Sequence, residues 1–521
     1  MIWRPTLSVL ALASLVLSAP SAHALTLDWS GYFRASHDFI YNYQMDKTEP
    51  GYSTRTNQGE DIPGQGNKNA TFSTMFMKLK PKILVNDNII VHSEWNVGDP
   101  IYGFFGRGIP QDDRNNPFST GKDAMSLSAA RLWLDVHTDF GTVQVGRAPM
   151  HWGLGVVFNS GDKPLDRYQS TSDTIRLISK FGYLSLMPLY AKNAMGSSLA
   201  GSRNPLTGAV ETTMIDREDD VTDYGLGLRY ENPEEDIDAG VLYYKRNAED
   251  KQNSYYFPAA QATYLNGANG INLRLFDFYA KKTWHRFELG AEVPIYSGEI
   301  GDMNGVGTRN QYKTTALAVE AALKYDSWRH ALKLGTAPGQ SAATTGARGS
   351  TFSAFQFHRA YKLGMLLFNY NFRNFGATNP DAVPNGASPG TAYNYPRAFS
   401  PYDAAITNAK YLMLSTEKHW EQWGMNFGLV WARANQTAQA GQDFFNPETH
   451  TWFTSVASQD KNMGVEADYG LRYNWDDNIS FGADFGMLFP GDYFNYINSA
   501  IPDVHKNSTT MGISFSATTV F

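Results

Sequence analysis

The sequence lacks cysteine entirely, so the protein can form neither disulfide bonds nor a lipid anchor on an N-terminal cysteine. Beyond the first 24 residues it also lacks any long uncharged apolar run, and this excludes a transmembrane helix, which needs about 20 consecutive apolar residues. Charged residues make up only 18% of the 521 residues, whereas aromatic residues make up 14% and there are 46 glycines. A soluble secreted protein of this size would often carry disulfides, while a membrane β-barrel closes its own edges by hydrogen bonding. The composition alone leaves both classes open.

The first 24 residues have the organisation of a secretory signal peptide. Arg4 supplies the positive charge, residues 7–17 form a short apolar run, and Ala22 and Ala24 form the small-x-small cleavage pattern. The apolar run is too short to span a bilayer as an anchor. We therefore expect cleavage after Ala24 and one mature domain over residues 25–521.

Residues of opposite character alternate along the C-terminal part of the chain. In 463–473, Val465 and Ala467 fall on one face and Glu466 falls on the other, and residues 479–488 repeat the alternation. A membrane β-strand needs about 9–11 residues of this kind, because apolar side chains face lipid and polar or small ones face the interior. Charges at every second position cannot lie in the core of a soluble sandwich, but they can line a wet lumen.

Short polar turns and long loops rich in Gly, Asn, Asp and Pro follow one another along the chain. The turns fall at 86–88, 138–141, 181–182, 232–235, 283–285, 326–328, 419–423 and 474–478. The loops fall near 44–70, 100–125, 150–172, 195–219, 250–271, 298–311, 374–408 and 436–461. We predict an all-β fold: a single transmembrane antiparallel up-and-down β-barrel of about 18–20 strands, with short periplasmic turns and long extracellular loops. The lower number applies if the apolar pair around 351–373 is not a pair of strands.

The last segment, 505–521, also alternates and ends on Phe521. It resembles the C-terminal signature by which the outer-membrane barrel assembly machinery recognises its substrates. The resemblance implies that Phe521 is a membrane-assembly signal and that this machinery is a partner. Tryptophans close to the short turns indicate an interfacial girdle; these are Trp284, Trp328, Trp420, Trp423 and Trp475.

The alternation also divides the charged residues of the strands between two faces. Lys78, Lys80 and Lys82 form a basic ladder on the inward face of one strand, and from about residue 286 the inward charges become acidic. Besides the three lysines, the predicted pore-lining residues are Arg131, Arg176, Arg229, Arg246, Glu288, Glu292, Glu320, Glu466, Asp468 and Asp484. One wall would then be basic and another acidic, and the field between them would orient polar solutes. The alternative is that these charges neutralise one another around trapped water.

The most distinctive motif is GRAPMHWG at 146–153, which follows the strand-like segment 130–147. It resembles the pore-wall strand of the general Gram-negative porins, which has the form GxVxxGRQ, and equally the polysaccharide-exporting barrels of the alginate-export type. Ala148 stands where both families usually have glutamine. The resemblance implies that Arg147 is a lumen arginine near the constriction. Strict alternation with Val145 would instead turn Arg147 toward lipid, so we expect it at the rim or past a bulge.

No constellation of catalytic or metal-binding residues stands out. The sequence has no nucleophile elbow, and a hydrolase triad is not evident. Two strands carry inward pairs, His92 with Glu94 and Asp135 with His137. A metal site needs three or four converging ligands, and no third partner is evident in the sequence. We therefore do not expect an enzyme.

Two acidic loops, 216–220 and 301–305, carry oxygen ligands of the kind that calcium prefers, but neither has the full spacing of a calcium loop. We expect no cofactor, with loop calcium left open. The first strand-like segment begins directly after the signal peptide, so there is no room for the plug domain of a TonB-dependent transporter.

These observations predict an outer-membrane, porin-like channel for the diffusion of small hydrophilic solutes. The lysine ladder and the tyrosine-rich strands suggest anionic or sugar-like solutes. Two other functions stay open: a polysaccharide-export barrel, and a non-conducting surface protein whose loops bind a partner. The expected partners are outer-membrane lipid and lipopolysaccharide, the assembly machinery and the solutes, with no nucleic acid. The protein would act as a monomer or a trimer.

Overall fold

The computed structural model describes residues 26–43, 45, 69–105, 125–194, 197–198, 215–216, 221–248, 270–301, 304, 308–344, 347–372, 402, 404–446, 451–455, 458–495 and 507–521. The expected signal peptide, residues 1–24, lies outside this set.

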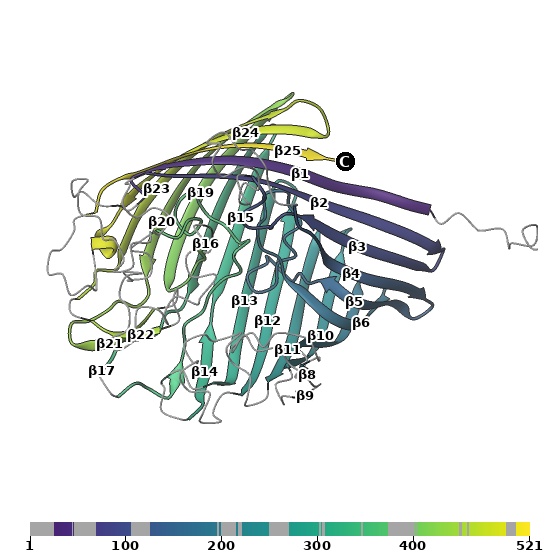
Figure 1. Cartoon of the computed structure of the whole chain (residues 1–521), viewed down its shortest axis with the longest axis horizontal. Helices are drawn as coiled ribbons and strands as arrows, with labels where there is room; N and C mark the ends of the chain where they lie inside the picture. The colour runs from purple at the N-terminus through teal and green to yellow at the C-terminus, as the bar shows by residue number, and fades with distance from the viewer. Residues whose placement is uncertain are drawn as a thin grey trace, which may run out of the picture.

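The described strands form one closed wall of eighteen antiparallel strands (Figure 1). One of them is interrupted at Ala316 and consists of two segments, β14 and β15, which both pair with β13. The interruption lies opposite Pro294, which has no N–H to donate to the ladder. The wall consists of β1 (Thr26–Tyr41), β2 (Ala70–Asn86), β3 (Ile89–Val97), β4 (Leu127–Thr138), β5 (Gly141–Pro149), β6 (Thr171–Phe181), β7 (Leu184–Ala194), β10 (Val221–Asn232), β11 (Ile237–Ala248), β12 (Ile271–Trp284), β13 (Phe287–Ile300), β14 (Asn310–Thr315), β15 (Leu317–Tyr325), β16 (Trp328–Ala337), β19 (Ala409–Trp420), β20 (Trp423–Ala434), β23 (Asn462–Asn474), β24 (Ile479–Pro490) and β25 (Thr510–Val520).

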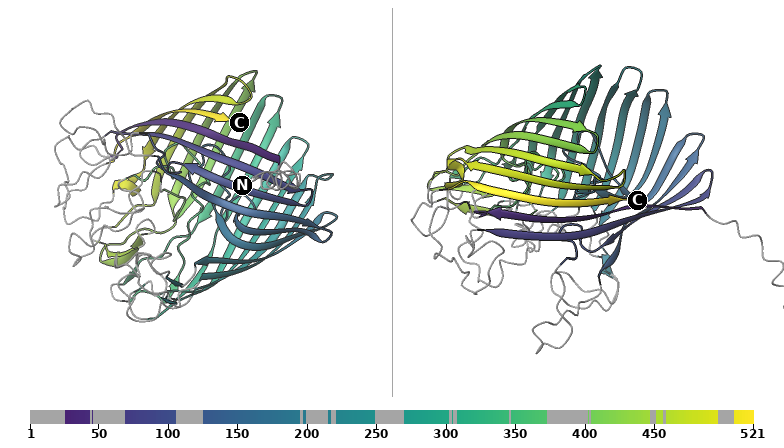
Figure 2. Two further views of the ribbon diagram at one scale, coloured as in Figure 1. Left: turned by 45° about the vertical axis from the view of Figure 1, so that its right-hand side comes forward. Right: turned by 90° about the horizontal axis from the view of Figure 1, so that it is seen from above.

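The first and last strands close the wall. β1 pairs with β2 along its length and with β25 from Tyr32–Val520 to Tyr41–Met511, and Figure 2 shows these two ends of the chain side by side. Closure removes the two long open edges that a flat sheet of these strands would have, and a sheet can exist in lipid only in this closed form.

The two ends of the barrel differ in the length of their connections. At one end, tight turns join β2 to β3, β4 to β5, β6 to β7, β10 to β11, β12 to β13, β15 to β16, β19 to β20 and β23 to β24. Asp326 and Glu421 adopt positive φ values of 49° and 46° in two of these turns. At the opposite, loop end lie the long connections, together with the small sheets β8 (Ser197–Ser198) with β9 (Ile215–Asp216) and β17 (Ala343–Thr344) with β21 (Gln442–Asn446) and β22 (Thr451–Thr454), and the 3-10 helix η3 (Asp492–Asn495). This asymmetry places the turn end in the periplasm and the loop end outside the cell.

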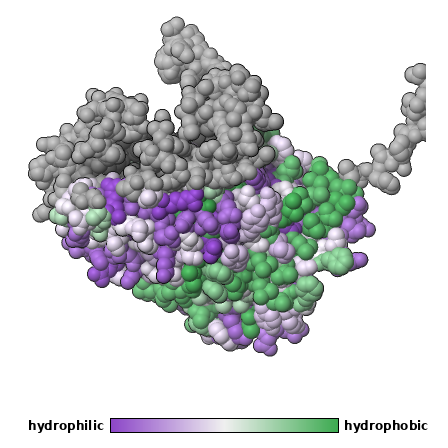
Figure 3. All heavy atoms as spheres, turned by 90° about the horizontal axis from the view of Figure 1, so that it is seen from below, coloured by the Kyte–Doolittle hydropathy of each residue, from purple (hydrophilic) through white to green (hydrophobic). Residues whose placement is uncertain are grey.

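Apolar side chains cover the outside of the barrel, as the two-residue alternation predicts. On β10, Leu226 and Leu228 are exposed on the outer face. The alternate residues face inward: Gly227 lies near Trp152, and Arg229 pairs with Asp238. Figure 3 shows hydrophobic residues gathered in a continuous zone on this face, beside a zone of hydrophilic residues. In the described part of the chain no helix is long and apolar enough to span a membrane.

Aromatic side chains surround the turn end. Phe140 is 81% exposed and Phe181 is 65% exposed, both beside tight turns. The tryptophans Trp284, Trp420, Trp423 and Trp475 are also exposed at this end. Such amphipathic rings are favoured at the boundary between hydrocarbon and headgroups.

The apolar pair around 351–373 does not form two further strands of the wall, so the lower end of the predicted range, eighteen strands, applies. Only β18 (Thr351–Phe352) is extended there, and it pairs in parallel with β14. The rest of the segment folds into the lumen, where Phe357, Leu366 and Phe368 are almost completely buried. A buried loop and a lipid-facing strand both need apolar residues, and the sequence pattern did not distinguish them.

The alternation predicts unequal effects of one charge on the two faces of β19. Leu414 is exposed on the outer face at mid-strand, and Ser415 follows on the inner face. Leu414→Arg places a cation in hydrocarbon and should lower the free energy of unfolding by about 2–4 kcal/mol. The measurement is guanidinium titration of the protein folded into lipid vesicles. Ser415→Arg, the matched control, should cost much less, and equal losses would contradict the assignment of faces.

Candidate solute pathway

The connection between β5 and β6, residues 150–170, folds into the barrel and is here named the first lumen loop. Glu292 on β13 holds it: the backbone N–H groups of Leu154 and Val156 donate to the Glu292 carboxylate, the latter at 3.2 Å. Gly153 has a φ of 57°, and a Cβ atom there would lie 2.5 Å from the same carboxylate. Glycine is therefore required for the loop to approach the wall.

A buried ion cluster supports the same loop from the opposite wall. The Arg131 guanidinium donates to the carbonyl oxygens of Ser160 at 2.6 Å and Ser170 at 3.0 Å, and it pairs with Glu94 at 3.1 Å. Lys78 donates to Glu94 at 3.3 Å and to the side chain of Gln169 at 2.8 Å. Because the buried guanidinium of Arg131 has this many acceptors, its role is to fix the position of the first lumen loop against the wall.

Two further arginines tie the first lumen loop to β1 and to the described start of the β3–β4 connection. Arg34, which is 1% exposed, donates to the carbonyl oxygens of Pro164, Asp166 and Pro100. Arg167 donates to the carbonyl oxygen of Ile101 at 2.7 Å, and its guanidinium also contacts the hydroxyls of Ser36 and Thr74.

The segment 353–372 also crosses the lumen and is here named the second lumen loop. Its Leu366 and Leu367 N–H groups both donate to the carboxylate of Glu466 on β23, each at 2.6 Å. The N–H of Met365 donates to Asp468 on the same strand at 3.2 Å. Each lumen loop therefore donates backbone N–H groups to its own wall carboxylate, the first loop to Glu292 and the second to Glu466.

The two lumen loops meet inside the barrel. The N–H of His358 donates to the carbonyl oxygen of Val156 at 2.7 Å. Near this junction the Arg167 guanidinium lies 3.8 Å from the ring centroid of Tyr402, whose hydroxyl donates to Asp38 on β1 at 2.8 Å. The lumen is therefore divided by contacts between loops that come from different parts of the chain.

A cavity of about 380 Å³ lies between the two lumen loops and the wall formed by β1, β19, β20 and β23 to β25. The loops contribute mainly cations to it, from Arg167, Arg359 and Lys362, together with the carboxyl group of Asp166. The wall contributes mainly carboxylates, from Asp38, Glu417, Asp468 and Asp484, together with Arg472. Arg472 pairs with Asp484 at 2.8 Å. The cavity thus has a basic side and a mainly acidic side, which is the geometry that orients dipolar solutes.

Burial shifts the titration of several groups on the lumen loops. It lowers the pKa of His358 to about 4, with Arg359, His151 and Lys362 adding repulsion from like charge. Burial also lowers the pKa of His151 and raises the pKa of Asp166. His358 is therefore uncharged at neutral pH, and its Nδ1 accepts the N–H of Ala360 at 3.1 Å.

Most of the predicted pore-lining residues project to the inner side of the wall, but most also have a partner. Lys80 lies 4.0 Å from Asp162, Arg229 pairs with Asp238, Arg246 with Asp223, and Glu320 with Lys333. Glu288 pairs with both Lys281 and Lys324, and Arg176 contacts Gln144. Lys82 lies directly opposite His92 of β3 in the pairing of the two strands. The structure brings Asp468 and Asp484 to the cavity between the lumen loops and the wall, and it makes Glu292, Glu466, Lys78 and Arg131 supports of the lumen loops.

Arg147 does not face the lumen. It lies on the outer face of β5 with Val145, and it is half-exposed. Its guanidinium forms a two-point ion pair with Asp173 on β6, at 2.6 and 2.8 Å. The position is two residues from the loop-end terminus of β5, at Pro149, where a paired charge can reach the headgroup region. This position differs from the lumen position that the family resemblance implies, and it lies near the rim of the barrel, where a charge on the outer face is least costly.

The histidines that the structure describes do not converge on a metal site. Among the described residues there is no group of three or more metal-ligating side chains. His92 contacts Asp135 at 3.1 Å rather than Glu94, and its ring stacks on Trp133. Of the two acidic loops considered for calcium, residues 217–220, 302–303 and 305 lie outside the described residues.

Sequence reasoning missed several residues of the pathway. Arg34 and Asp38 alternate with apolar residues on β1 and could have been assigned to the inner face by the rule used elsewhere. Arg167, Arg359 and Lys362 lie in connections, where no periodicity indicates direction.

Comparison with known proteins finds similarity in fold only. No protein-family model matches the sequence, and no curated protein matches it. Three solved structures are similar over 95% of this chain: OccK9 (OpdG) of Pseudomonas aeruginosa (98% of that chain, 11% identity, TM-score 0.46), a BenF-like porin from Pseudomonas fluorescens Pf-5 (98%, 9%, 0.46) and OccAB3 of Acinetobacter baumannii (100%, 10%, 0.45). At these identities and TM-scores the likeness assigns neither a solute nor a residue role. The closed eighteen-strand wall, its apolar outer face and its unequal ends make this chain a porin-like β-barrel of the bacterial outer membrane.

Proposed function

We propose that the protein is a channel for small hydrophilic solutes, which pass between the two lumen loops and the wall of β1, β19, β20 and β23 to β25. The observation that supports this most is the 380 Å³ cavity with mainly cations on one side and mainly carboxylates on the other. A passage of this kind favours solutes that carry both donors and acceptors, such as sugar-like or zwitterionic molecules.

The lysine ladder gives little support for a preference for anions. Lys78 is buried and paired with Glu94, and Lys80 lies near Asp162. Because these charges are offset locally, they add little to the field in the passage.

A second function is favoured by one observation. Within the barrel, the second lumen loop packs a cluster of buried aromatic and aliphatic side chains, among them Phe357, Leu366, Phe368 and Phe372. A lumen filled in this way also suits a non-conducting surface protein whose exposed loops bind a partner.

Planar-bilayer recording separates the two functions. A channel should give discrete ion currents, and vesicles that contain it should swell in small sugars but not in large ones. The control is the same preparation unfolded by heat. Folded protein that passes neither ions nor sugars would overturn the proposed channel and favour the surface protein.

Removing the anchor of the second lumen loop should widen the passage. Glu466→Ala deletes the acceptor of the Leu366 and Leu367 N–H groups, and a buried donor left without a partner costs about 1–3 kcal/mol. We expect higher single-channel conductance and faster uptake of sugars by vesicles.

The matched control for Glu466→Ala is Glu299→Ala. Glu299 lies at the loop-end part of β13 and pairs with Arg309 rather than with a lumen loop. Equal conductance of the two variants and of the unmodified protein would mean that Glu466 does not hold the passage closed.

Acid should open the junction between the lumen loops. An exposed histidine titrates near pH 6.5, whereas the pKa of buried His358 is about 4. As the pH falls from about 6.5 to 4, an opened junction takes up a proton that the closed junction does not, so opening becomes more favourable. Conductance should rise over this range, and the rise should be smaller in His358→Gln. Identical pH profiles of the two proteins would rule out His358 as the sensor.

A further inference from the structure

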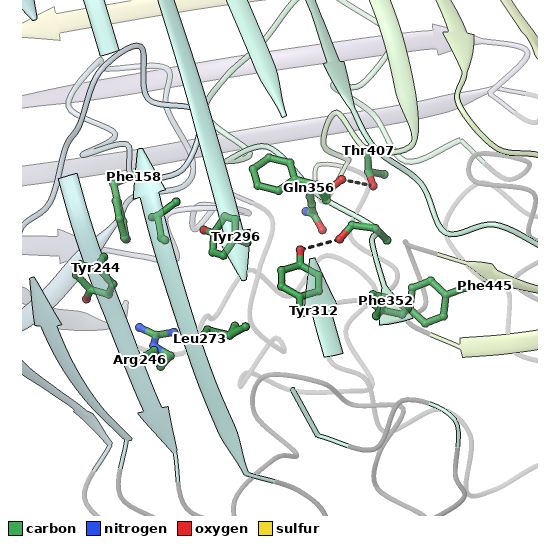
Figure 4. Close-up of a pocket in the computed structure, with 13 residues that line it drawn as sticks. Phe158, Tyr244, Arg246, Leu273, Tyr296, Tyr312, Phe352, Gln356, Thr407 and Phe445 are labelled. Carbon is green, nitrogen blue, oxygen red and sulfur yellow. Dashed lines mark hydrogen bonds between the residues drawn. The ribbon is translucent and has the colours of Figure 1, made fainter. Parts of the chain in front are cut away.

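A second cavity, of about 290 Å³, lies between the second lumen loop and β11 to β14 (Figure 4). Among its lining residues, Arg246 is two residues from the loop end of β11, and Leu273 is two residues from the start of β12. Tyr296 lies four residues closer to the loop end of β13 than Glu292, which anchors the first lumen loop. A solute that enters from the loop end therefore meets this cavity before it reaches the junction of the lumen loops.

Aromatic rings from both the wall and the loops form the sides of the cavity. On one side Phe158 packs against Tyr244, with ring centroids 5.1 Å apart. On the other side Tyr296 packs edge-on against Tyr312 at 5.7 Å, and Tyr312 stacks on Phe352 at 6.1 Å. Figure 4 shows these side chains around a common space. Rings fixed by one another offer flat and edge-on contacts to a further ring at little cost in entropy.

The charge of the only cation in the cavity lining is offset. Arg246 donates through Nε and Nη2 to the Asp223 carboxylate at 2.8 and 2.7 Å, and Asp223 is fully buried. The buried acid Asp277 lies on the same face of β12 as Leu273 and Leu275, both of which line the cavity. The surroundings therefore provide no excess of positive charge for a carboxylate ligand.

The polar groups of the cavity are few. The amide of Gln356 lies near the rings of Tyr296 and Tyr312 in Figure 4 and supplies one donor group and one acceptor. The Thr407 hydroxyl donates to the carbonyl oxygen of Phe355, and the Tyr312 hydroxyl donates to that of Ala354. A sugar would leave several hydroxyls without partners here, and an unpaired buried hydroxyl is costly. A single polar substituent on a flat ring can be satisfied.

We propose that this cavity binds an uncharged aromatic solute with a hydroxyl or amide substituent, of the phenol class, on its way into the passage. The part of the inference that concerns entry into the passage rests on the proposed channel function, whereas binding to the cavity does not. The ring lies between the two aromatic sides, and its substituent reaches Gln356.

Saturation-transfer NMR on the folded protein in detergent tests the proposal with a matched pair of probes. 4-Hydroxybenzyl alcohol is uncharged, and 4-hydroxybenzoate has the same ring with a carboxylate. We expect saturable transfer to the alcohol and at least about tenfold weaker binding of the benzoate. Glucose, the third probe, should give no saturable signal that is lost when this cavity is filled.

Two variants locate the binding. Leu273→Trp fills the cavity from β12 and should weaken binding of the alcohol by about tenfold or more. Leu189→Trp makes the same change on the inner face of β7, where Leu189 lines a different cavity, and should leave binding unchanged. Heat-modifiable migration on gels verifies that both variants are folded.

Each other outcome overturns the proposal. Equal binding of the benzoate removes the preference for uncharged solutes, and binding of glucose alone removes the aromatic class. A signal that survives Leu273→Trp comes from the detergent or from another surface. If the protein binds the probes with this specificity but passes no ions, the proposed ligand class of the cavity stands and only the proposed channel function is overturned.

Discussion

The interior of this barrel depends on wall carboxylates that accept backbone N–H groups. Glu292 receives the N–H groups of Leu154 and Val156, and Glu466 receives those of Leu366 and Leu367. A loop that turns away from water must find partners for its backbone groups, and few of these partners can come from a sheet whose own ladder is complete. Side chains on the inner face provide them. The positions of both lumen loops, and hence the shape of the passage, follow from where these acids stand on β13 and β23.

Ion pairing explains why the many charged residues of the lumen do not produce a strong, uniform electric field across it. Lys78 and Arg131 share Glu94, Arg246 is held by Asp223, and Arg229 by Asp238. Most of these charges act on a neighbour rather than on a solute. The exception is the cavity beside β23 and β24, where cations come from the loops and carboxylates from the wall. Mutual neutralisation of the inward charges therefore describes most of the interior better than a basic wall opposed to an acidic one.

The wall could be predicted from the sequence to a large extent, and the contents of the lumen could not. Two-residue alternation depends only on the local geometry of an extended chain, so the sequence alone predicts which residues of β23 and β24 share a face. The lumen loops have no such period. The apolar run around 351–373 therefore left two strand counts open, and the burial of Phe357 and Leu366 inside the barrel decides for the lower one. The roles of Glu292 and Glu466 as anchors, rather than groups in a water-filled pore, depend on loops that arrive from more than 90 residues away.

The seam between β1 and β25 has a consequence for biogenesis. The last residue, Phe521, exchanges hydrogen bonds with Gly31 near the start of the first strand, at 2.8 and 3.1 Å. Until residues 510–521 have been delivered, the edge of β1 that they cover is without its partner, and an open edge of this length is a template for aggregation. Closure of the barrel must therefore wait for the C-terminal strand, whatever the order in which the other strands pair.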